Sequence, residues 1–184
     1  MEKVYKFCKE NNTFVMEIYE IKSGLRKPVV VEKVEEKDFK ILTKRRFSFR
    51  WKSLKGEADI YKLHIVEEPD ILGVMGLVDV PEEKRIEIKL LANSVENRGR
   101  HKLHDRVAGC MIAYACVLAS KKYEGDACLS LLPKTNLVNH YIQKYRMVPG
   151  GRQLYLERES MYYITNKYFY VSSKTEREGY SGGT

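Results

Sequence analysis

An apolar run at residues 107–119 follows directly on a basic stretch at 97–106, and this junction constrains the fold more than any other segment. The run is shorter than the ~20 residues that a membrane-spanning helix needs. It is apolar on all sides, which is typical of a helix buried in a protein core. The cations just before it outnumber the one acid, Asp105; they are Arg98, Arg100, Lys102 and Arg106.

The composition favours one soluble globular domain. The chain has 184 residues, 43% of them hydrophobic, and a formal net charge of +8. We predict one domain over residues 1–171 and a disordered polar tail at 172–184. The four cysteines form no C-x-x-C pair, which indicates reduced core thiols rather than a disulfide framework or a metal site. Because the N-terminus has no apolar leader region, we expect a cytoplasmic protein.

Hydrophobic periodicity predicts a mixed α/β domain. Two β-rich runs with a turn between them indicate a hairpin, and three alternating segments after them indicate an antiparallel meander. After the buried helix, the order strand, helix, strand completes the pattern. The predicted strands are 13–21, 28–34, 59–66, 70–80, 85–92, 126–132 and 153–158, and the predicted helices are 35–44, 107–119 and 136–145.

The junction before residue 107 suits an anion. The first turn of a helix presents unpaired backbone N–H groups and the positive end of the helix dipole, which together bind phosphate groups. Gly99, Ala108 and Gly109 are small enough to let a ligand approach the backbone. The pattern fits either a site for a phosphorylated cofactor or a solvated loop before an ordinary helix. No P-loop or G-x-G-x-x-G motif is present, which argues against a P-loop NTPase or a Rossmann dehydrogenase.

Residues 59–157 include the run ILGVMGLVDVPEEKRIEIKLLANSVENRGRHKLHDRVAGCMIAYACVLA and the later GDACLSLLPKTNLVNHYIQKYRMVPGGRQLYLE. Through these segments the chain resembles the GNAT (GCN5-related) N-acetyltransferases. The resemblance implies a central, mostly antiparallel twisted sheet of about six to seven strands flanked by helices. It also implies an enzyme that transfers an acetyl group from acetyl-CoA, as co-substrate, to an amine by direct attack in a ternary complex.

The resemblance assigns the cofactor to the junction. The family's pyrophosphate loop, Q/R-x-x-G-x-G/A, corresponds to residues 103–108, where Leu103 and Arg106 depart from the pattern and Ala108 fits it. Arg106 either adopts a positive φ or directs its side chain at a phosphate. The residues expected to bind acetyl-CoA are Leu90, Leu91, Ala92, Arg98, Arg100, Lys102, His104, Arg106, Val107, Ala108, Gly109 and Asn136.

Two residues are candidates for acid–base catalysis. Glu87 matches a position where many family members hold a carboxylate, and Tyr141 resembles the family tyrosine that donates to the CoA sulfur. Glu87 fits equally a surface ion pair, and Tyr141 fits core packing beside Ile142 and Tyr145. Asn136 is also a good helix N-cap residue.

Residues 44–52 alternate basic and aromatic side chains, with Phe47, Phe49 and Trp51 on one side. An extended segment of this kind either packs its aromatics inward or stacks them on nucleic-acid bases. The resemblance implies that these three aromatics line the acceptor groove. A non-catalytic CoA-binding or protein-interaction module with the same fold is the alternative to an enzyme, and a nucleic-acid binder is disfavoured. No metal site or membrane partner is expected. The sequence leaves the acceptor and a homodimer open.

Overall fold

The computed structural model describes residues 13–172. Its strands are β1 Thr13–Glu20, β2 Arg26–Lys33, β3 Asp59–Ile65, β4 Ile71–Val80, β5 Arg85–Asn93, β6 His104–Asp105, β7 Cys128–Leu131, β8 Val148–Gly150, β9 Gln153–Glu157 and β10 Phe169–Ser172. Its α-helices are α1 Lys44–Phe47, α2 Val107–Tyr123, α3 Val138–Tyr145 and α4 Arg158–Tyr168. Its 3-10 helices are η1 Glu36–Lys40, η2 Trp51–Leu54, η3 Pro81–Glu83, η4 Val95–Asn97, η5 Glu124–Asp126 and η6 Thr135–Leu137.

The strands of the described part form one ten-stranded sheet in the order β10-β1-β2-β3-β4-β5-β7-β9-β8, with β6 paired to β1. The β5–β7 pair is parallel, and the other recorded pairs are antiparallel. The predicted hairpin, meander and mixed architecture are therefore confirmed. The predicted number of strands was too low, because the short strands β6, β8 and β10 carry too few residues to show a period.

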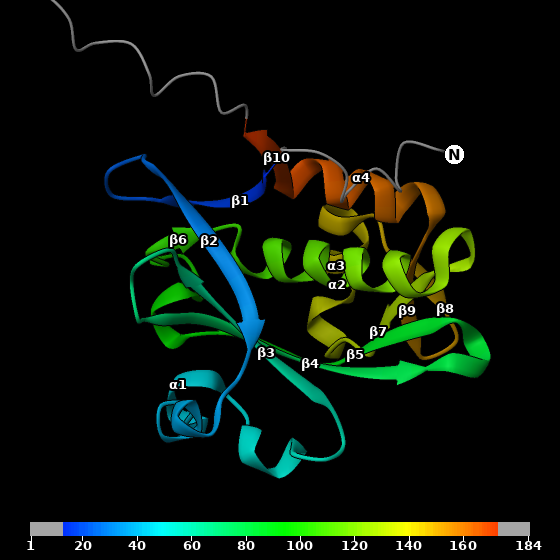
Figure 1. Ribbon diagram of the computed structural model, residues 1–184, viewed down its shortest axis with the longest axis horizontal. Coiled ribbons are helices and arrows are strands. Elements are labelled where there is room, and N and C mark those ends of the chain that lie inside the picture. Colours follow the sequence, from blue (N-terminus) through cyan, green and yellow to red (C-terminus); the bar gives the residue numbers. More distant parts are fainter. Residues whose placement is uncertain (1–12, 173–184) are drawn as a thin grey trace, which may run out of the picture.

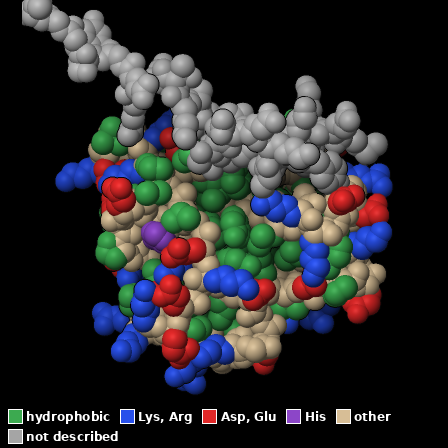
Figure 2. All heavy atoms as spheres, viewed as in Figure 1, with side chains coloured by type: hydrophobic (Ala, Val, Ile, Leu, Met, Phe, Trp, Pro, Cys, Tyr) green, Lys and Arg blue, Asp and Glu red, His purple; other side chains and the backbone are tan. Residues whose placement is uncertain are grey.

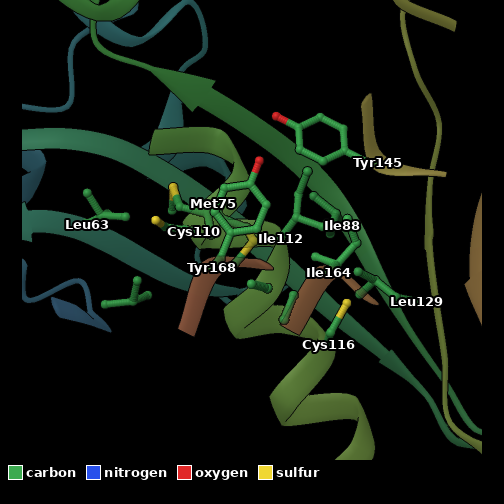
Figure 3. Packing of buried hydrophobic residues seen from close by; sticks show 14 of the residues in the cluster. Leu63, Met75, Ile88, Cys110, Ile112, Cys116, Leu129, Tyr145, Ile164 and Tyr168 are labelled. Atoms are coloured by element: carbon green, nitrogen blue, oxygen red, sulfur yellow. The ribbon is translucent and has the colours of Figure 1, made fainter. Parts of the chain in front are cut away.

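The sheet carries two apolar clusters of unequal size on its two faces. The larger packs α2 and α4 against one face and includes Leu63, Met75 and Ile88 (Figures 1 and 3). The smaller packs α1 and η2 against the other face, around the fully buried Phe47 and Trp51. The sheet thus separates the long buried helix from the short helical segments that follow β2.

Helix α2 forms the centre of the larger cluster, as its sequence predicted. Gly109 faces Tyr168 of α4, and a Cβ placed there would lie 2.1 Å from the tyrosine ring. The small residue therefore allows two helices to touch, which corrects the expectation that it gives a ligand access to the backbone. Cys110, Cys116 and Cys128 are buried free thiols, as expected, whereas Cys8 lies outside the described residues.

The basic–aromatic segment 44–52 is helical rather than extended. It comprises α1, a left-handed Ser48 and the start of η2. Because Phe47 and Trp51 have no exposed surface, they cannot stack on nucleic-acid bases, and only Phe49 is partly exposed. The alternating residues do not form a strand. The chain turns twice over this segment and buries the rings of Phe47 and Trp51 in the smaller cluster.

The C-terminal part of the domain adds α4 and β10, which the sequence did not predict. The predicted tail at 172–184 lies outside the described residues apart from Ser172, which ends β10. No helix of residues 13–172 has the length and hydropathy of a membrane span. On the face drawn in Figure 2, basic and acidic side chains are interspersed around a hydrophobic centre, so the positive charge is not gathered there.

Candidate active site

A cleft opens where β5 and β7 part. Their parallel pairing ends at Ile88 opposite Leu131, although β5 continues to Asn93. At the same place the pairing of β5 with β4 skips one residue, because Gly76 lies opposite Leu90 and Leu77 opposite Ile88. Lys89 is thus the extra residue of a β-bulge, a feature that bends a strand away from its neighbour.

The cleft has a volume of about 490 Å³, within the range usual for small-molecule sites. It runs from the β5–β7 end to the N-terminus of α2, and α3 forms one wall. The predicted cofactor residues that line it are Leu90, Leu91, Ala92, Arg98, Lys102, His104, Arg106, Val107 and Ala108, and the predicted catalytic Tyr141 lines it too. Phe49 also lines it, whereas Phe47 and Trp51 do not.

The N-terminus of α2 presents free amides to the cleft. The first bond of the helix runs from the Cys110 amide to the Arg106 carbonyl, at 2.9 Å. The amides of Val107 and Ala108, whose residues line the cleft, have no acceptor among the described residues. A helix begun in this way offers N–H groups and a positive dipole end to an anion.

Arg106 adopts the left-handed conformation, with φ +75°, at the N-cap of α2. The sequence left two possibilities for this residue, and the structure selects the positive φ. A side chain in this conformation costs about 1 kcal/mol that glycine avoids. The helix N-terminus is therefore aimed at the cleft in spite of the departure from the glycine of the family pattern.

The Arg106 side chain turns toward β1 and α4. Its Nε donates to the carbonyl oxygen of Glu17 at 3.1 Å, and its Nη2 donates to that of Lys167 at 2.7 Å. The guanidinium also lies 4.6 Å from the centroid of the Tyr168 ring, within cation–π range. These contacts come from both ends of the domain and compensate the backbone strain. The Arg106 side chain therefore anchors the start of α2 to β1 and α4 and does not contact a phosphate as expected.

Cations surround the α2 end of the cleft, together with one carboxylate. Lys102 Nζ donates to Asp105 Oδ1 at 2.5 Å, and Lys144 Nζ lies 3.9 Å from the same oxygen. Burial raises the pKa of Asp105, but the hydrogen bonds from Lys102 and from the Arg106 amide outweigh it and hold the pKa below its usual value. Arg98 donates instead to the carbonyl oxygens of Ser94 and Arg46 and to the Ser48 hydroxyl, which ties the loop to α1.

Tyr141 places a phenol in the cleft. Its ring packs against Tyr145 and His140, and its hydroxyl has no hydrogen-bond partner among the described residues. Burial raises the pKa of Tyr141, so the group stays protonated at neutral pH and is able to donate a proton. The Tyr141 ring also packs against the larger core cluster, as does its neighbour Ile142.

Glu87 lies on the face of the sheet that points away from α2 and does not line the cleft. Its Oε2 accepts from Arg85 Nη1 at 3.2 Å and from Gln153 Nε2 at 3.4 Å. Its Oε1 lies 3.9 Å from the ammonium of Lys89, which does line the cleft. These contacts make Glu87 part of an ion-pair network with Arg85 and Lys89.

Three further predicted cofactor residues lie outside the lining. Arg100 is exposed on the loop, Gly109 is buried against Tyr168, and Asn136 is exposed on η6. Asn136 caps no helix, since Lys134 occupies the N-cap of η6 and Leu137 that of α3. The prediction that Asn136 is an N-cap was wrong because η6 precedes α3.

The structure adds cleft residues that sequence reasoning missed. Lys134 and Lys144 contribute ammonium groups, and their positions after β7 and near the end of α3 gave no motif. His104 Nε2 and Asn93 Oδ1 are buried without a partner in the described part and belong to residues of the lining. Burial lowers the pKa of His104, so its imidazole favours the neutral form. Among residues 13–172 no group of His, Cys, Asp or Glu is arranged to hold a metal ion.

Comparison with known proteins identifies the fold. No protein-family model and no curated protein sequence matches the chain. Among solved structures, an IAA acetyltransferase from Bacillus cereus aligns with a TM-score of 0.50 and 15% identity over 71% of this chain and 99% of that chain. An acetyltransferase from Bacillus subtilis in complex with CoA aligns at a TM-score of 0.47 and 10% identity, over 71% and 97% of the two chains. An N-acetyltransferase from Staphylococcus aureus aligns at 0.47 and 12%, over 70% and 98%. At such identities the likeness concerns the backbone arrangement, and by that arrangement this chain has the fold of the GNAT acetyltransferases.

Proposed function

We propose that this chain is an acetyl-CoA-dependent N-acetyltransferase that moves an acetyl group to an amine by direct attack in a ternary complex. The observation that carries the proposal is the cleft between the parted strands β5 and β7, with the free amides of Val107 and Ala108 at its far end. A donor with a diphosphate at one end and a thioester at the other matches these two features. Bound acetyl-CoA supplies an activated acyl group.

The residues of the cleft fit the donor. The α2 amides, Lys102 and Lys144 hold the diphosphate, and the unpaired edge of β5 from Leu90 to Ala92 pairs with the amide-bearing arm. A backbone N–H near Leu91 polarises the thioester carbonyl; one such donor contributes on the order of 3 kcal/mol to transition-state stabilisation.

Acid–base chemistry falls to Tyr141 and Glu87. The amine nitrogen forms a bond to the acyl carbon, the carbon–sulfur bond breaks, and the Tyr141 hydroxyl gives its proton to the departing sulfur. Glu87 takes the proton of the amine through one water molecule, since its Oε1 lies 3.9 Å from the ammonium of Lys89, a residue that lines the cleft. A base that acts through one water remains within the reach that general-base catalysis requires.

Calorimetric titration with acetyl-CoA, followed by an assay of thiol release with a panel of amines, tests the proposal. We expect saturable binding, acceptor-dependent release of CoA and initial-rate lines that intersect, as direct attack requires. Ala108→Asp, which puts a carboxylate at the α2 amides, abolishes binding, whereas Asn166→Asp on the exposed side of α4 leaves it unchanged. Absence of binding at millimolar acetyl-CoA would remove the proposal.

A CoA-binding module without turnover is the second candidate. The lining of the cleft contains a single carboxylate, Asp105, and that group is paired with Lys102 at the donor end. Binding of acetyl-CoA together with no release of CoA across the amine panel, and no change in either for Glu87→Gln, favours this candidate over the enzyme.

A further inference from the structure

The end of the cleft where β5 and β7 part is positively charged. Lys89 directly follows Ile88, the last residue of β5 that pairs with β7, and Lys134 lies three positions after Leu131, the last residue of β7. Lys89 belongs to β5 and Lys134 to the segment after β7, and both residues line the cleft. No carboxylate of the described residues lines this end, since Asp105 lies at the N-terminus of α2.

Lys134 is held in place without an acidic partner. Its Nζ lies 5.5 Å from the centroid of the Phe49 ring, and no carboxylate of the described residues pairs with it. The Phe49 ring in turn meets the buried Trp51 edge-on, with centroids 6.0 Å apart and planes at 85°. A cation–π contact orients an ammonium group and leaves its charge uncompensated.

Lys89 is only weakly compensated. Its nearest carboxylate, that of Glu87, is 3.9 Å away, and the same carboxylate accepts from Arg85 at the shorter distance of 3.2 Å. Arg85 also pairs with Glu83, away from the cleft lining. The carboxylate of Glu87 is thus shared between Arg85 and Lys89, and Lys134 adds a further positive charge to the lining.

The negative charges of acetyl-CoA do not account for the presence of Lys89 and Lys134 at this end of the cleft. In acetyl-CoA the negative charges are on the phosphates, and an uncharged arm separates them from the thioester. When the diphosphate meets the α2 amides and Lys102, the thioester end brings no charge to Lys89 or Lys134. The other reactant, the acceptor amine, is therefore the one that contacts Lys89 and Lys134.

From this juxtaposition we infer that the acceptor is an amine that also carries a carboxylate or a phosphate group, and that Lys134 and Lys89 bind that group. The inference rests on the proposed acetyltransferase function and adds its substrate class. Coulomb repulsion disfavours a polycationic amine beside two ammonium groups, and an anionic group on the acceptor converts that repulsion into attraction.

Matched amine pairs test the inference with the full chain and acetyl-CoA. The pairs are phosphoethanolamine against ethanolamine, for phosphate, and phenylalanine against phenethylamine, for carboxylate, with thiol release as the readout. We expect kcat/KM to be at least tenfold higher for the anionic member of one pair or both, and the pair that shows the larger ratio identifies the anion. Lys134→Ala removes most of this preference by lowering kcat/KM for the anionic member alone, and Lys134→Glu reverses it. Lys121→Ala, the same change on the exposed far part of α2, alters neither.

A second measurement makes the test independent of turnover. Calorimetry of the same amines on CoA-saturated Tyr141→Phe protein is expected to give tighter binding of an anionic member, and Lys134→Ala is expected to abolish the difference. If neutral amines bind and react as well as anionic ones, or if Lys134→Glu leaves the ratios unchanged, the inference is overturned. Acceptor-dependent release of CoA in the same assay would still support the proposed function. If acetyl-CoA itself does not bind, the proposed function fails.

Discussion

The two ends of the cleft are built in different ways. The α2 end is set by contacts between distant parts of the chain, because Arg106 reaches the carbonyl oxygens of Glu17 and Lys167. The β5–β7 end is set by nearby features, namely the bulge at Lys89 and the short connection that carries Lys134. The difference shows that a helix N-terminus can keep its orientation although its loop departs from the family pattern, since tertiary contacts replace the glycine.

The largest effect is expected from a substitution that pushes α2 away from α4, the helix that packs against its N-terminal part. Gly109→Ala puts a methyl group 2.1 Å from the buried Tyr168 ring, and overpacking of this kind destabilises the fold by about 3 kcal/mol. Urea unfolding measures the loss. Gly151→Ala, at φ +63° with nothing within 4 Å of the added carbon, is the control and is expected to cost about 1 kcal/mol. Equal losses in the two variants would contradict the role of the Gly109–Tyr168 contact.

Tyr141→Phe is expected to slow the reaction and to leave the affinity for the donor unchanged. Loss of the proton donor lowers kcat by about 100-fold and leaves the Kd for CoA nearly unchanged. Because burial raises the pKa of Tyr141, the acid form persists from neutral pH to about pH 9, so the wild-type rate shows no fall over that range from this group. A kcat–pH profile with a downward limb near pH 8 that vanishes in Tyr141→Phe would contradict the raised pKa.

Replacement of Arg106 separates backbone conformation from anchoring. Arg106→Gly relieves the positive φ but removes both hydrogen bonds to carbonyl oxygens, so we expect binding of CoA to weaken by about tenfold. Binding of pantetheine, which has no diphosphate, is expected to stay the same. If Arg106→Gly binds CoA as tightly as the wild type, the side chain is not needed to hold the α2 end, and the contrast between the two ends disappears.

Much of the fold could be predicted because its signals are local. The apolar run that became α2 and the alternating segments that became β3, β4 and β5 show their periods within a few residues. The extended conformation predicted for segment 44–52 was wrong, because alternating basic and aromatic residues match a strand whereas burial of Phe47 and Trp51 determines the fold of this segment. Local patterns do not record which distant surface a ring will meet.

The candidate site could be placed but not completed. The loop before α2 and Tyr141 were assigned through the resemblance to the family, and residues of both line the cleft. The left-handed Arg106 depends on partners from β1 and α4, and the role of Lys134 depends on the ring of Phe49. Contacts across such sequence separations leave no periodic trace, which is why the anchoring of one end and the charge of the other emerged only from the structure.

Calorimetric comparison of CoA with pantetheine on the unmodified protein tests the central claim most directly. If the free amides of Val107 and Ala108 bind a diphosphate, CoA binds on the order of 100-fold more tightly than pantetheine, and added salt reduces this difference in affinity. Equal affinity for the two ligands would show that the N-terminus of α2 contributes nothing to donor binding and would contradict the account.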